Sequence, residues 1–185
     1  MITPVEISDW MLKAIREEGE SLARMSGWLE MERYQWVSMT SRTISHILNG
    51  GTVLVCTDEE RQWFGKYIVS SINRLGGKSR PILPIFDSNE LLPKTLTFKE
   101  TSLINDVLDI SYKDYMFWYI GKTSTPLANL AFSKENGFFW IFDDSIQDGL
   151  TLSSLDTMID YRLIQLFRIF EKTLFDALFG KIILE

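Results

Sequence analysis

The chain has 185 residues, of which 45% are hydrophobic, and this length favours one domain with a sizeable core. Its 19 basic and 25 acidic residues give a net charge of −6 without a run of Lys and Arg, which argues against direct binding to nucleic acid. One cysteine excludes an internal disulfide, and the chain shows neither a secretion signal nor an apolar run near the ~20 residues of a membrane span, so we expect a cytoplasmic protein without a membrane partner.

The first part of the chain predicts two helices before any strand. Apolar residues at helical spacing predict a first helix that begins after an N-cap at Ser8. A second helix is predicted over residues 28–48, and the glycines at 50 and 51 end it. Because a simple βα alternation would begin with a strand, we expect residues 1–49 to form a helical arm suited to packing against a second copy of the chain.

The middle of the chain, residues 50–154, predicts an α/β core. Apolar, β-branched or aromatic runs predict strands over residues 52–56, 81–86, 115–120, 138–142 and 149–152. Helices are predicted over residues 57–75, 103–110 and 126–131, and residues 87–100 are expected to be a loop. This alternation indicates a doubly wound, mostly parallel five-stranded sheet flanked by helices, all within a single domain of residues 1–185.

The last segment, residues 155–185, predicts a long helix over residues 155–179. Its polar residues form one narrow stripe, so we expect the sheet and a neighbouring subunit to cover the remaining surface. The aromatic content of 13%, including six Trp, also favours a surface covered by another chain. The residues predicted at a subunit interface are Trp28, Trp36, His46, Phe170 and Phe175.

Acidic residues follow the predicted strands where a doubly wound sheet places its ligand. Asp58, Glu59 and Glu60 follow the first strand, and carboxylates in this position would repel a phosphate group. One interpretation is a Mg²⁺ site of the receiver-domain type, since Mg²⁺ prefers oxygen ligands. We favour the other interpretation, in which Asp58 caps the following helix.

The chain predicts no catalytic residue, cofactor or metal ion. His46 is the single histidine and lies on an apolar helix, so we interpret it as structural or as an interface residue. Cys56 ends an apolar strand with no cation beside it in sequence, which favours a buried, inert thiol. No Gly-x-Ser-x-Gly motif is present. The protein is therefore not expected to be an enzyme.

The helix after the first strand carries candidate partner-binding residues. Trp63 and Tyr67 are four residues apart and share a helix face, with Asp58 and Arg61 at the same end. Ordinary core packing and the anchoring of a protein partner are both open for this group.

Five stretches of the chain are distinctive: SGWLEMER (26–33), TISHILNGG (43–51), the pair WF (63–64), MFW (116–118) and DYRLIQLF (160–167). Together they resemble the HobA family of replication regulators from epsilon-class proteobacteria. The likeness extends in order from about Trp10 to Ile183.

This resemblance implies a sugar-isomerase-like (SIS) fold without sugar chemistry. It also implies a homotetramer that binds the N-terminal domain of the replication initiator DnaA and scaffolds its oligomerisation at the origin. Leu178 and Phe179 resemble a Leu-Phe pair of the related regulator DiaA, in which the pair belongs to the initiator-binding surface. The alternative is a sugar-phosphate isomerase or sugar-phosphate-binding module on the same fold.

Overall fold

A five-stranded sheet forms the middle layer of the computed structural model, which describes residues 7–24, 27–74, 80–92, 101–134 and 136–184. The strands are β1 (Thr52–Thr57), β2 (Ile85–Asp87), β3 (Tyr115–Lys122), β4 (Gly137–Phe142) and β5 (Gly149–Leu152). Their order is β2-β1-β3-β4-β5, and every neighbouring pair is parallel. The predicted fold class is confirmed. Only β2 is shorter than expected, because Pro81 and Pro84 have no N–H for a strand ladder.

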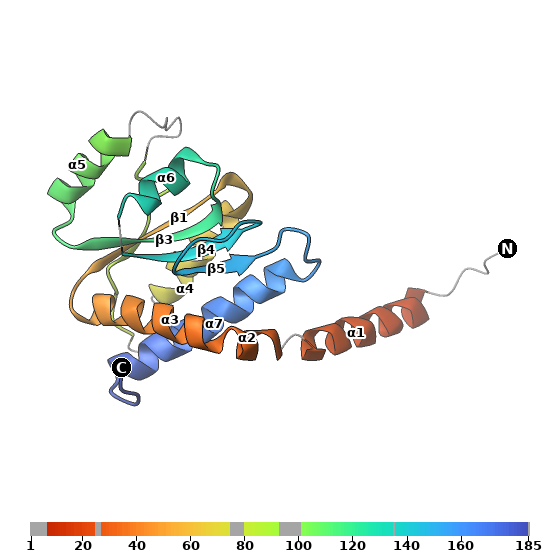
Figure 1. Ribbon diagram of the computed structural model, residues 1–185. Coiled ribbons are helices and arrows are strands. Elements are labelled where there is room, and N and C mark those ends of the chain that lie inside the picture. Colours follow the sequence, from red (N-terminus) through yellow and green to blue (C-terminus); the bar gives the residue numbers. More distant parts are fainter. Residues whose placement is uncertain (1–6, 25–26, 75–79, 93–100, 135, 185) are drawn as a thin grey trace.

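Helices cover both faces of the sheet, as Figure 1 shows. One face packs against α3 (Arg33–Leu48), α4 (Gln62–Ile72) and α7 (Ile159–Leu178). The other packs against α5 (Thr101–Ser111) and α6 (Pro126–Phe132). Side chains alternate along a strand, so Trp118 of β3 lies in the first core and its neighbours Phe117 and Tyr119 lie in the second.

The N-terminal helices differ from the prediction in two ways. The first, α1 (Ile7–Arg24), already includes Ser8, so Ser8 is not its N-cap. The predicted second helix is divided at Glu32 into α2 (Trp28–Met31) and α3. Different contacts hold the two pieces: the Trp28 indole donates a hydrogen bond to Gln165 of α7 (3.1 Å), whereas the Trp36 ring packs on the sheet.

Only α1 projects from the body of the molecule in Figure 1. The predicted helical arm over residues 1–49 includes α3, but α3 packs on the sheet and belongs to the layered core. None of the described helices is both long and apolar enough to cross a membrane.

The helices α4 and α7 also begin later than predicted. A 3₁₀ turn (Glu59–Arg61) precedes α4. The start of α7 shifts to Ile159 because Asp156 stabilises a preceding turn, in which its carboxylate accepts the Met158 N–H (2.9 Å) and its carbonyl accepts the Ile159 N–H (3.1 Å). The end of α7 agrees with the prediction to one residue, and Gly180 follows with φ +70°, a conformation that glycine adopts at low cost.

Candidate functional site

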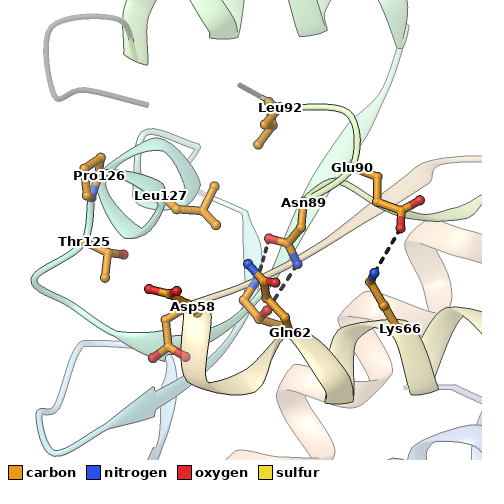
Figure 2. Close-up of a pocket in the computed structure, with 11 residues that line it drawn as sticks. Asp58, Gln62, Lys66, Asn89, Glu90, Leu92, Thr125, Pro126 and Leu127 are labelled. Carbon is orange, nitrogen blue, oxygen red and sulfur yellow. Dashed lines mark hydrogen bonds and ion pairs between the residues drawn. The ribbon is translucent and has the colours of Figure 1, made fainter. Parts of the chain in front are cut away.

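A crevice of about 700 Å³ lies at the carboxyl ends of β1 and β3 (Figure 2). The strand order reverses between these two strands, and such a switch point is the usual ligand position in an open α/β sheet. On one wall Lys66 pairs with Glu90 (3.2 Å), and Asn89 donates a hydrogen bond to Thr57 (3.1 Å). The full lining is Thr57, Asp58, Glu59, Gln62, Lys66, Asn89, Glu90, Leu92, Thr125, Pro126 and Leu127.

Asp58 connects the ends of β1 and β3 and does not cap a helix. Its Oδ2 accepts hydrogen bonds from Arg61 (2.5 Å) and from the backbone N–H of Lys122 (3.0 Å). Its side chain makes no capping hydrogen bond, so the predicted capping role is wrong. Asp58 lies so near β3 that a Cβ on Gly121 would be 2.9 Å from its carboxylate, which explains the glycine at that position.

Arg61 completes a buried ion pair with Asp58. Its guanidinium lies 3.6 Å from the ring centroid of Phe142 at the end of β4, and it also donates to the Ser154 hydroxyl (3.4 Å). Arg61 is 7% exposed and Asp58 is 8% exposed. Most of both side chains is covered by their own chain, and the contact of Asp58 and Arg61 with a partner stays a prediction.

The crevice is poorly suited to a phosphate group. The helix α6 begins with Pro126, which has no N–H, and its Ala128 N–H is already bonded to the Thr125 hydroxyl (3.0 Å). The Lys122 N–H is taken by Asp58. Carboxylates of Asp58 and Glu59 line the same space and would repel an anion.

The acidic residues after the strands do not assemble into a metal site. In the part of the chain that the structure describes, no three His, Cys, Asp or Glu residues are placed to hold a metal ion. Burial raises the pKa of Asp87. Hydrogen bonds from the Ser154 hydroxyl and N–H lower the pKa of Asp143, so this carboxylate serves the β4–β5 connection. The Mg²⁺ interpretation therefore lacks a ligand cluster among these residues.

Neither His46 nor Cys56 supplies reactive chemistry to the crevice. Nε2 of His46 is 3.0 Å from the Thr52 carbonyl, and Nδ1 is 3.8 Å from Asp114. The ring therefore lies at the amino ends of β1 and β3, whereas the crevice lies at their carboxyl ends. Nε2 must donate, since a carbonyl oxygen only accepts. Cys56 is fully buried, and burial raises the pKa of its thiol, which confirms the prediction of an inert cysteine.

The residues predicted at a subunit interface lie largely inside their own chain. Phe170 is fully buried against Trp118 and Phe138, and Trp36 is buried against Phe138, so both are core residues rather than interface residues. Phe175 is also buried, with the Arg80 guanidinium 4.2 Å from its ring centroid. Trp28 and His46 are half-buried, and each contacts its own chain.

The remaining predicted partner-binding residues form two separate surfaces. Trp63 is exposed, while Tyr67 is half-buried with its ring 5.3 Å from Phe167 of α7. Phe179 is exposed and Leu178 is half-buried at the far end of α7. At 1.5 Å per residue, Phe179 lies about 18 Å along the helix from Phe167. One compact contact patch therefore does not include both groups.

Two features of the crevice were missed at the sequence level. Thr125 and Pro126 form an N-cap followed by proline at the first helical position, a pattern that the sequence does carry. The contact between Asn89 and Thr57 joins residues 32 apart and has no local sequence signal.

Comparison with known proteins connects the whole chain to one family. A family model described as "HobA: DNA replication regulator" matches residues 4–184. The DNA replication regulator protein HobA of Helicobacter pylori (strain ATCC 700392 / 26695) is 38% identical over 179 residues, which cover 95% of this chain and 97% of that protein.

Solved structures give the same result. The crystal structure of a HobA–DnaA (domain I–II) complex from Helicobacter pylori matches with a TM-score of 0.87 and 37% identity, covering 98% of this chain and 100% of the matched chain. HobA from the same organism matches with a TM-score of 0.83 and 38% identity, over 97% and 100% of the two chains. A phosphoheptose isomerase from Francisella tularensis has a TM-score of 0.53 at 16% identity, over 90% and 96%, and shows a shared fold alone.

Proposed function

The chain belongs to the HobA family of DNA replication regulators, and from this membership we propose that it binds the N-terminal domain of the initiator DnaA. The observation that carries the proposal is the match over 98% of the chain to a relative whose crystal structure is a complex with DnaA domain I–II. The net charge of −6 favours action through this protein partner rather than through direct contact with DNA. A regulator of chromosome replication acts in the cytoplasm.

The proposed mechanism is non-enzymatic. It is supported by the ion pair of Asp58 and Arg61 at the crevice and by the position of His46 at the amino ends of the strands, away from the crevice. The shared fold with a phosphoheptose isomerase does not support sugar-phosphate chemistry for this chain. A phosphate would need backbone N–H donors in the crevice, which is lined instead by the carboxylates of Asp58 and Glu59 and by Pro126.

Titration of the full-length chain with the N-terminal domain of DnaA from the same organism tests the proposal. We expect heat of binding at micromolar concentrations in calorimetry, with saturation at a defined ratio. Absence of binding, together with a rise in melting temperature on adding a sugar phosphate, would contradict the proposal and support the alternative.

The proposal includes a homotetramer that holds several initiator molecules together and so raises their effective concentration relative to one another. Its support is α1, which projects from the body with Ile7, Trp10 and Met11 exposed on one face. A groove of about 700 Å³ between α3, α7 and the C-terminal segment, lined in part by Val37 and Ile183, offers an apolar surface for this helix from another subunit.

Replacing Trp10 with aspartate is expected to lower the mass measured by light scattering, because a charge on this face opposes burial against a second copy. The matched control is Leu155→Asp, which places the same charge on an exposed apolar residue in the turn before α7 and should leave the mass unchanged. An unchanged mass in the Trp10 variant would exclude α1 from the interface.

A further inference from the structure

The chain contains two Asn-Gly pairs, Asn49-Gly50 and Asn136-Gly137. In such a pair the backbone nitrogen of the glycine can attack the side-chain carbonyl carbon of the asparagine, because glycine has no Cβ to obstruct the approach. Asparagine is accordingly one of the thermolabile residues that proteins adapted to heat use less. In a folded chain, the surroundings of the glycine decide whether the reaction proceeds.

The first pair lies in an exposed turn between α3 and β1. Asn49 and Gly50 are both exposed, and a Cβ built on Gly50 would meet no atom within 4 Å. The Gly50 N–H donates to the Ile47 carbonyl (3.0 Å), and Asn49 has ψ 6°, so the turn must open before the nitrogen can rotate toward the asparagine side chain. A turn that is exposed to water opens locally at a small cost in free energy.

The second pair is held in place by the sheet. Gly137 is buried as the first residue of β4, pairs with Phe117 of β3, and accepts a hydrogen bond from Arg42 at its carbonyl (3.2 Å). A Cβ on Gly137 would be 1.9 Å from the Phe139 ring, so this ring lies directly against the glycine backbone. Although Asn136 is exposed, the nitrogen of its glycine cannot rotate without disrupting the end of a central strand.

We propose that Asn49 is a site of spontaneous chemical modification, at which the asparagine becomes isoaspartate or aspartate. The Gly50 nitrogen forms a bond to Asn49 Cγ, the bond from Cγ to the side-chain nitrogen breaks, and that nitrogen leaves as ammonia with the proton of Gly50. Water then opens the cyclic imide. Attack at the main-chain carbonyl gives isoaspartate, and attack at the side-chain carbonyl gives aspartate. The reaction consumes one water and releases one ammonia, without an oxidant or a cofactor.

The modification acts on the junction between α3 and β1. The Gly51 N–H donates to the His46 carbonyl (2.9 Å), and a Cβ on Gly51 would be 2.3 Å from Nε2 of the His46 ring. That ring donates in turn to the Thr52 carbonyl (3.0 Å) at the start of β1. Isoaspartate adds one carbon atom to the main chain just before Gly50 and so displaces these contacts. Aspartate adds a negative charge at the carboxyl end of α3, where the helix dipole disfavours it.

Peptide mapping of the full chain, aged at neutral pH in water enriched in heavy oxygen, tests the proposal. We expect the product to carry one solvent oxygen and to form at least about tenfold faster at Asn49 than at Asn136, because a buried strand end opens far less often than an exposed turn. Two matched variants make the result specific. Asn49→Gln should lose most of the isoaspartate, and Asn136→Gln should form as much as the wild type.

The melting temperature measures the effect on the junction. The aged protein should melt at a lower temperature than the fresh protein, and this fall should be absent from the aged Asn49→Gln variant. Asn49→Asp adds the charge without the extra main-chain carbon and should lower the melting temperature less than isoaspartate does. Equal rates at the two Asn-Gly pairs, or an isoaspartate yield that Asn49→Gln leaves unchanged, would overturn the proposal. Modification of Asn49 only in chains unfolded by urea would also overturn it, by showing that the turn stays closed in the native fold.

Discussion

Replacing Arg61 with alanine is expected to lower the free energy of unfolding by about 3–5 kcal/mol, the range for removing one partner of a buried ion pair. The variant leaves the largely buried Asp58 carboxylate without its counter-ion, and the Lys122 N–H remains as its donor. It also removes the guanidinium that lies over the Phe142 ring at the end of β4. Urea denaturation followed by tryptophan fluorescence measures the change.

The neighbouring Glu60 provides the control for this variant. Its carboxylate is 3.1 Å from Arg61 but its side chain is exposed, so Glu60→Ala should change the free energy of unfolding by less than about 0.5 kcal/mol. A double variant that replaces Asp58 and Arg61 with Leu and Met should recover part of the loss, because it leaves no buried charge. Equal stability of Arg61→Ala and the wild type would show that the pair does not hold the strand ends together.

Phe170→Ala is expected to lower the free energy of unfolding by about 3–5 kcal/mol, the usual cost of truncating a buried phenylalanine. Its ring centroid is 4.7 Å from that of Trp118 and 5.3 Å from that of Phe138, so truncation opens a cavity between α7 and the sheet. Because the side chain is enclosed by its own chain, we expect the mass in light scattering to remain that of the wild type. The two proteins must be compared at one concentration, since association contributes to stability.

Phe179→Ala is the matched control, because this phenylalanine at the end of the same helix is exposed. It should cost less than about 1 kcal/mol. A Phe170→Ala protein that lost mass while keeping its free energy of unfolding would contradict the core assignment and restore Phe170 to a subunit interface.

Much of the fold was predictable because its strands are buried on both faces. A short, uncharged aromatic run such as residues 115–120 predicts a central parallel strand wherever it lies in the chain, because only such a strand buries the side chains on both of its faces. The bounds of β5 also agree with the prediction. The division of the second helix at Glu32 was not predictable, because it follows from contacts of Trp28 and Trp36 with distant parts of the chain.

The candidate site was less predictable than the sheet. Its location after the parallel strands followed from the alternation of strands and helices, but the role of Asp58 did not. A carboxylate before a helix is usually a cap, and here it is drawn away by the Lys122 N–H, which lies 64 residues along the chain. In the same way, the apolar residues of α5 were visible in sequence, but which of them the core leaves uncovered depends on how α5 packs against the sheet and α6.

The sequence by itself determined the α/β class, the parallel sheet, the inert Cys56 and the resemblance to the HobA family, because these depend on local composition and on strings of residues. Only the tertiary structure decided that Asp58 and Arg61 are a buried pair, that Phe170 and Trp36 belong to the core, and that Trp63 and Phe179 lie on separate surfaces. The physical reason is that burial and ion pairing are properties of neighbours in space, and these neighbours come from segments that are far apart along the chain.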